Sequence, residues 1–307
     1  MDVLFLILLQ VIFPVFAMLA AGAVLHRKYR FDMKTLSRLT TSVFMPALAF
    51  VNIYESQIAG DLLADLILFL LVQNLGLMVV GNIAARVAGL DRKVASTFKN
   101  SVVLNNSGNY GLPVSQLVFA GNPAGMSIQV IVTIFQNLVT HTYGLFNSIS
   151  VQAKGVKTFV EMVKMPILYA LLAGVALKGL GVAIPGFIWK PVENVANAFL
   201  AVALFTLGAQ VAYLKIRRPS LLLTLTVIGR LLVSPSLALL IITIMGLEGV
   251  TAQALFIASS YPCSRNTALF ALEYDNDPDY AAEAVLLTTL LSAITVTVVV
   301  YLSKIFW

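Results

Sequence analysis

Two polar runs interrupt long apolar stretches of this chain, and their residue types suit the binding of an anion. The first run is LNNSGNYGLP at residues 104–113, and the second is SSYPCSRNT at residues 259–267. Asn, Gly and Pro in one run unwind a helix and free backbone groups that must find other partners. The half-helices that begin after the two breaks would point the positive ends of their dipoles, each about half a charge, at one place.

Arg265 adds a full positive charge to the second run, about midway along its apolar stretch. A planar guanidinium is well suited to a carboxylate. The residues that we expect to bind the anion are Asn105, Asn106, Asn109, Arg265, Asn266 and Thr267, with Pro113 and Pro262 defining the half-helix ends. The alternative is that both runs are kinks satisfied by neighbouring helices, with Arg265 a structural arginine bonded to freed carbonyls.

The elements that must position these runs are strongly apolar. Of the 307 residues, 59% are hydrophobic and 11% are charged, and the mean hydropathy of +0.92 lies outside the range of soluble domains. This composition argues against a water-soluble enzyme. One cysteine excludes a disulfide framework, and with two histidines it leaves little for a metal site, so we expect no metal and no cofactor.

The pattern of hydropathy predicts an all-α integral membrane protein with ten transmembrane helices, since each span needs about 20 apolar residues. The predicted spans lie at about 3–25, 33–54, 62–88, 94–119, 123–150, 158–180, 189–213, 219–245, 250–274 and 279–303. We expect the first span to be retained, because Asp2 replaces the positive start of a signal peptide and the basic cluster at 26–30 follows the apolar run.

The net charge of +6 indicates membrane topology rather than a nucleic-acid partner. If the chain starts outside, most of its 20 Lys and Arg residues fall in the inner loops. The positive-inside rule therefore predicts a multi-pass protein of the cell (inner) membrane with both termini on the outer side.

The two halves of the chain carry similar sequence features. Pro14 and Gly22 recur as Pro166 and Gly174, each 152 residues later. Five spans per half force the halves to insert with opposite orientation, so the pattern predicts an inverted five-plus-five repeat in which the fourth and ninth helices are broken. The predicted repeats are residues 1–150 and 151–307.

Other polar residues in the predicted spans have less specific roles. Arg230 lies midway through the eighth span, where we expect it to pack or to pair with backbone carbonyls. Asn74, Gln136 and His141 either line a cavity or form hydrogen bonds between helices. The absence of a carboxylate from the predicted middle layer argues against an aspartate-pair proton antiporter.

The two polar runs resemble the auxin efflux carrier family, which includes the plant PIN carriers and bacterial transporters thought to move malate, malonate and similar acids. Residues 261–279 follow the plant pattern L-P-x(7)-F-A-x-E-Y-x-x-x-P-D, with Tyr261 in place of the leucine. Residues 106–113 are similar to the plant N-T-x-x-x-G-I-P, and residues 105–113 to the bacterial N-x-x-G-N-x-G-L-P. The motifs cover about 40 residues, and the similarity in topology covers the whole chain.

The resemblance implies a crossover fold in which helices 1, 2, 6 and 7 form a dimerising scaffold and helices 3–5 and 8–10 form a mobile transport domain. It also implies that Asn106 binds the substrate carboxylate, that Pro262 shapes the second crossover, and that Asp65 corresponds to an aspartate of the plant carriers. Arg265 stands where the plant carriers have an apolar residue. A permanent cation there favours a small, strongly anionic acid over indole acetate.

These observations favour a secondary active or facilitative transporter of small organic anions, such as malate or malonate, that works by an elevator mechanism as a homodimer in the bilayer. A coupled Na⁺ or H⁺ is an open alternative to uncoupled transport, with Asp65, Asn74, Gln136 and His141 as coupling or cavity-lining candidates. The rival functions are an anion channel and an auxin-like monocarboxylate efflux carrier. An intramembrane enzyme would need a nucleophile with its base, an aspartate pair or a metal motif, none of which the sequence contains.

Overall fold

A computed structural model describes residue 5 and residues 7–55, 60–149, 166–213 and 220–307. The predicted boundary between the repeats, the loop after it and the start of the sixth predicted span lie outside the described residues. The described helices and π-helical turns (η) of the first half are η1 (Leu8–Ile12), α2 (Phe13–Tyr29), α3 (Met33–Leu39), η2 (Thr40–Phe44), α4 (Met45–Glu55), α5 (Gly60–Val87), α6 (Arg92–Val103), η3 (Ser107–Gly111), α7 (Leu112–Val118), α8 (Pro123–Val139), η4 (Thr140–Gly144) and α9 (Leu145–Ile149). Those of the second half are α11 (Pro166–Gly179), α12 (Gly186–Val211), α13 (Leu221–Val227), η5 (Ile228–Val233), α14 (Ser234–Met245), α15 (Gly249–Ser259), α16 (Arg265–Glu273) and α17 (Pro278–Phe306).

Six described helical segments are long and apolar enough to cross a membrane. They are Leu8–Tyr29, Leu62–Val87, Pro123–Ser148, Gly186–Val211, Leu221–Met245 and Pro278–Phe306. Shorter apolar helices are Ser42–Glu55, Tyr169–Gly179 and Gly249–Ser259. The all-helical architecture and these spans are those of an integral membrane protein, while the number of ten spans stays a prediction.

The surface of α5 shows how such a helix meets its surroundings. Large apolar side chains are exposed at three- and four-residue spacing along one face: Leu68, Leu71, Leu75, Val79 and Ile83. The opposite face buries residues such as Leu66, Phe69 and Leu77. A helix that is apolar on both its buried and its exposed faces is suited to lipid rather than to water.

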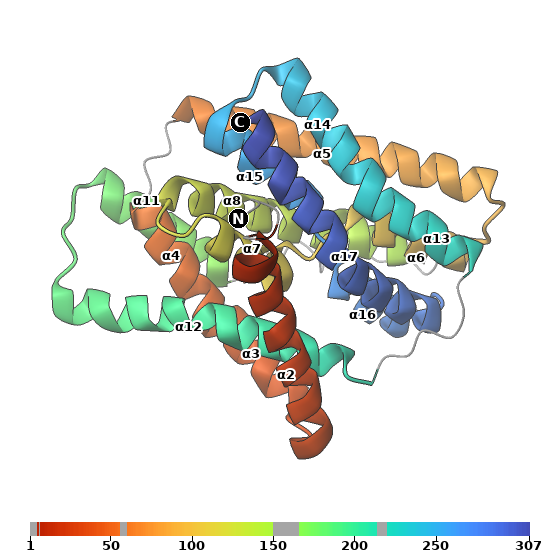
Figure 1. Cartoon of the computed structure of the whole chain (residues 1–307), viewed down its shortest axis with the longest axis horizontal. Coiled ribbons are helices and arrows are strands. Elements are labelled where there is room, and N and C mark those ends of the chain that lie inside the picture. The colour runs from red at the N-terminus through yellow and green to blue at the C-terminus, as the bar shows by residue number, and fades with distance from the viewer. Residues whose placement is uncertain (1–4, 6, 56–59, 150–165, 214–219) are drawn as a thin grey trace.

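One group of helices packs around α12, which contacts α2, α3 and α4, while α11 contacts α4 (Figure 1). The approach of α2 and α12 is very close, because a Cβ added at Gly22 would overlap the backbone of Phe205 and one added at Gly208 would overlap the backbone of Leu19. Glycine at both positions therefore lets the two backbones touch.

A second group contains the two broken helices. Here α5 packs on α6 and α14, α15 packs on α8, α14 and α17, and α16 packs on α17 (Figure 1). Two helices of this group, α8 and α17, begin in the same way: the side chains of Asn122 and Asp277 cap them, and Pro123 and Pro278 follow. Proline in the first turn needs no amide donor there, so both starts are locally well determined.

Both helix breaks lie where the sequence predicts them. Helix α6 ends at Val103 and helical structure resumes at Ser107, whereas α15 ends at Ser259 and α16 begins at Arg265. The extended residues between these ends meet as an isolated antiparallel pair, Asn105 with Cys263. Because each break satisfies backbone groups of the other, the irregular chain is tolerated inside the protein.

Candidate functional site

The two breaks are joined by backbone hydrogen bonds. The Asn106 amide donates to the Pro262 carbonyl at 2.8 Å, and the Ser264 amide donates to the Leu104 carbonyl at 2.8 Å. The structure thus brings the predicted residues Asn105, Asn106 and Pro262 together. Pro113 lies further on, in the first turn of α7 after the π-helical turn η3.

The two breaks meet where Asn105 pairs with Cys263, and we call this place the crossing. The half-helices that follow the breaks begin there. Asn106 precedes η3 without capping it through its side chain, so its amide group is not used there. Ser264 caps α16, where its hydroxyl accepts from the Asn266 amide at 3.2 Å. Both helix starts therefore contribute positive dipole ends to the crossing.

Three predicted asparagines have buried polar atoms without a hydrogen-bond partner in the described structure: Asn105 Oδ1, Asn106 Nδ2 and Asn109 Oδ1. Asn106 is 5% exposed and Asn105 is 6% exposed, and the Asn105 Nδ2 atom donates to the Ala258 carbonyl at 3.3 Å. Buried polar atoms are nearly always satisfied in proteins, by protein, water or ligand. The Asn106 donor at a helix start is therefore suited to an anion.

Arg265, the first residue of α16, lines a cavity of about 480 Å³ between the two groups of helices. From the first group, His26, Lys34, Gln210 and Tyr213 also line it. Its other described lining residues are apolar, and none of them is acidic. The cavity therefore carries positive charge on both of its sides.

The remaining predicted site residues are spread over the second group. Thr267 is buried, and the Cys263 thiol lies 3.5 Å from its hydroxyl. Asn74 on α5 and Gln136 on α8 are hydrogen-bonded, since Gln136 Nε2 donates to Asn74 Oδ1 at 3.2 Å. Asp65 is exposed on α5, and His141 lies in η4 with its side chain outside the described part.

Arg230 donates hydrogen bonds to carbonyls at the C-terminal ends of the helices that precede the breaks. This agrees with the expected pairing of Arg230 with backbone carbonyls. Arg230 is 1% exposed, and its Nη1 atom donates to the carbonyls of Val102 and Val103 at 2.8 and 3.2 Å. Its Nη2 atom donates to the Ser259 carbonyl at 2.6 Å and to the Ser234 hydroxyl. These carbonyls lie at the C-terminal ends of α6 and α15.

Two buried tyrosines, which the sequence analysis does not assign to the site, make further contacts at the crossing. The rings of Tyr110 and Tyr261 meet edge to face with centroids 6.0 Å apart. Ser292 on α17 donates to the Tyr110 hydroxyl at 2.9 Å, and the hydroxyls of Tyr261 and Ser115 lie 2.7 Å apart. In the sequence, only their position within the two polar runs could have indicated that these tyrosines belong to the site.

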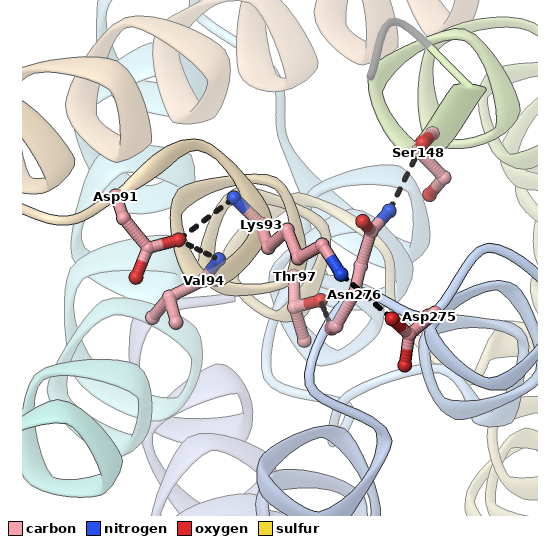
Figure 2. A network of polar contacts seen from close by, with 7 residues as sticks. All are labelled: Asp91, Lys93, Val94, Thr97, Ser148, Asp275 and Asn276. Carbon is pink, nitrogen blue, oxygen red and sulfur yellow. Dashed lines mark hydrogen bonds and ion pairs between the residues drawn. The ribbon is translucent and has the colours of Figure 1, made fainter. Parts of the chain in front are cut away.

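A polar network at the start of α6 connects helices of the second group at a place outside the crossing (Figure 2). Lys93 pairs with Asp275 at 2.6 Å, and this hydrogen bond holds the pKa of the exposed Asp275 carboxyl below its usual range. Thr97 donates to the Asn276 carbonyl, and Asn276 Nδ2 donates to the Ser148 carbonyl at 3.0 Å. The loop between α16 and α17 is thereby attached to α6 and α9.

Comparison with known proteins identifies the class to which this fold and crossing belong. Residues 147–300 match the family model described as "Membrane transport protein", and the chain belongs to this family, that of the auxin efflux carriers and PIN-like proteins. The family resemblance seen in the polar runs is thus confirmed.

Two archaeal proteins named as uncharacterized transporters are similar over most of their length. The one from Methanothermobacter thermautotrophicus is 27% identical over 269 residues, which cover 86% of this chain and 87% of the relative. The one from Methanocaldococcus jannaschii is 22% identical over 306 residues, which cover 96% of each chain. The protein is therefore a multi-pass member of a family of membrane transporters.

Proposed function

We propose that this protein carries small organic anions, carboxylates such as malate or malonate, across the cell membrane. The observation that carries the proposal is the crossing of two broken helices beside a basic cavity. At the crossing, the buried Asn106 Nδ2 donor has no partner in the described structure, and Arg265 lines the cavity next to the α16 start. Backbone dipoles, an amide donor and a guanidinium together favour a carboxylate.

The cavity supports an anion rather than a cation as the substrate. Lys34 and Arg265 line it from opposite helix groups, and its described lining residues include no carboxylate. A basic concave surface with low-dielectric walls concentrates anions from solution. Because the cavity lies between the two groups of helices, its cationic side chains would attract the substrate to the boundary along which the groups would move in transport.

The proposal includes an elevator mechanism, and the packing within each of the two helix groups supports it. The group around α12 has its own close contacts through Gly22 and Gly208, and the group with both breaks is tied together by Arg230 and the tyrosines. We assign the first group to a scaffold that forms a homodimer and the second to a mobile transport domain. The same proposal includes ten spans, an inverted repeat of residues 1–150 and 151–307, and both termini outside.

The test is counterflow of labelled malate in proteoliposomes, with malonate, acetate and indole acetate as competitors. Arg265→Ala should weaken anion affinity by about 2 kcal/mol or more, roughly thirtyfold, if it forms a desolvated charged contact. The matched control is Arg27→Ala, since Arg27 Nε and Nη2 donate to the Ala212 carbonyl at 3.0 and 2.7 Å. This control should keep wild-type affinity.

The outcomes separate the rival functions. Saturable exchange that dicarboxylates inhibit best, and that weakens in Arg265→Ala, would support the proposal. Flux without counterflow would favour an anion channel, and strongest competition by indole acetate would favour a monocarboxylate efflux carrier. Unchanged affinity in Arg265→Ala would remove that residue from the binding site.

A further inference from the structure

The carbonyl groups at the C-terminal ends of the broken helices α6 and α15 are satisfied from outside those helices. The last carbonyls of a helix have no partner within it. In α6 this applies to Val102 and Val103, and in α15 to Ser259, and all three accept from Arg230. Ser234, four residues after Arg230, also donates to the Ser259 carbonyl at 2.7 Å.

This oxygen set has the chemistry of a site for a monovalent cation. Transporters built from broken helices bind coupling ions with unwound backbone carbonyls and half-helix C-terminal ends. Each such end carries about half a negative charge, so two of them together balance one cation. Within the described residues, the hydrogen bonds that Arg230 donates all go to carbonyl or hydroxyl oxygens, so helix ends rather than a carboxylate balance its charge.

The helix that supplies Arg230 holds it in place. Arg230 lies in the π-helical turn η5, a feature that is frequent at functional sites. Gln73 on α5 donates to the Ser234 carbonyl at 2.9 Å and to its hydroxyl at 3.3 Å. The guanidinium is therefore a fixed component of the crossing and is covalently attached to a neighbouring helix.

We propose that Arg230 is a tethered cation that occupies the place of a coupling ion, so that the transport cycle needs no Na⁺ at the crossing. The consequence for transport rests on the proposed function, whereas the cation site itself does not. Removing the guanidinium should leave a buried set of oxygens that a free cation of suitable size can enter. Arg230→Ala should thus acquire a dependence on cations that the wild type lacks.

The first experiment measures thermal unfolding of purified protein in detergent, in choline chloride with added guanidinium or Na⁺ at up to about 20 mM. Arg230→Ala should start with a lower Tm, and guanidinium or Na⁺ should raise this Tm by at least about 3 °C through binding to the folded state. The wild type and Arg27→Ala should shift by less than about 1 °C, because Arg27 contacts one carbonyl at a partly exposed helix end. Equal shifts in all three proteins would overturn the proposal.

A second variant covers the case in which Arg230→Ala does not fold. Arg230→Gln keeps an amide donor and removes the charge, and it should show the same gain on titration with guanidinium or Na⁺. If a folded variant shows no rise in Tm on addition of either cation, Arg230 does not occupy a cation site and the proposal is wrong.

The second experiment measures malate counterflow in proteoliposomes with Na⁺ replaced by choline. Wild-type exchange should change less than about twofold, whereas exchange by Arg230→Ala should fall more than about tenfold in choline and recover severalfold with guanidinium. Wild-type exchange that requires Na⁺ would overturn the inference. If the wild type exchanges no acid, the proposed function fails, and the thermal titration still decides the cation site.

Discussion

Replacement of Asn106 by alanine should weaken anion binding while leaving the stability of the protein nearly unchanged. Asn106 is buried, and its Nδ2 donor has no partner in the described structure. A buried unsatisfied polar group costs about 1–3 kcal/mol. Because the substitution removes this cost together with some packing contacts, the two effects oppose each other, and we expect a net change within about 1 kcal/mol.

The effect on binding follows from the same atom. A hydrogen bond to a charged group contributes about 1.5–3 kcal/mol, so losing one to a carboxylate should weaken affinity roughly tenfold to a hundredfold. Titration calorimetry of malate on purified protein measures the affinity, and intrinsic fluorescence on heating measures the Tm. Counterflow should show the corresponding increase in the apparent KM.

Asn100 provides a matched control on the preceding helix. Its Nδ2 atom donates to the Gly144 carbonyl at 3.0 Å and to the Ser148 hydroxyl at 2.8 Å, and its Oδ1 atom accepts from Asn147 at 2.9 Å. Asn100→Ala removes these three buried hydrogen bonds, so it should destabilise the fold by about 1–3 kcal/mol and keep wild-type affinity. If instead Asn106→Ala loses stability like Asn100→Ala and binds malate normally, Asn106 is a structural residue and the reasoning is refuted.

Two further predictions concern parts of the protein away from the anion. Gly208→Ala should lower the Tm by an amount that corresponds to about 1–3 kcal/mol, because its Cβ would overlap the Leu19 backbone, whereas Gly186→Ala, with open space around it, should not. Lys93→Met should raise the pKa of Asp275 toward its usual range, as measured by NMR of ¹³C-labelled carboxyls. Because the Asp275 pKa is lowered in the folded protein, the pair stabilises above the unfolded-state value of about 3.8, and this contribution should disappear as the pH falls through the folded-state pKa.

The helix breaks could be predicted because they depend on local residue types. Asn, Gly and Pro within an apolar stretch disfavour a continuous helix whatever surrounds them, and both interruptions occur within the predicted runs. The starts of α8 and α17 are local in the same way, since Asn122 and Asp277 each precede a proline. Sequence indicates such features because the physical cause lies within a few residues.

The partners across the crossing could not be predicted, since they depend on packing between distant segments. Nothing in the periodicity indicates that Arg230 reaches Val102, which lies 128 residues earlier, or that Asn105 pairs with Cys263. In the sequence, the basic residues near the inner loops serve only as markers of topology, yet one of them, Lys34, lines the cavity with Arg265. The fold of each segment is thus more readily predicted than the set of side chains that converge on the site.

If the protein carries anions as we propose, the charges at the crossing should favour a dicarboxylate over a monocarboxylate. The C-terminal ends of α6 and α15, about one negative charge together, are balanced by Arg230, so they do not oppose an anion nearby. The helix starts after the breaks supply about one positive charge, and Arg265 at the start of α16 supplies another. Malonate carries two negative charges and acetate one, so a contact with Arg265 should matter more for malonate. The preference for malonate over acetate in counterflow should therefore narrow in Arg265→Ala, and an undiminished preference would show that discrimination arises elsewhere.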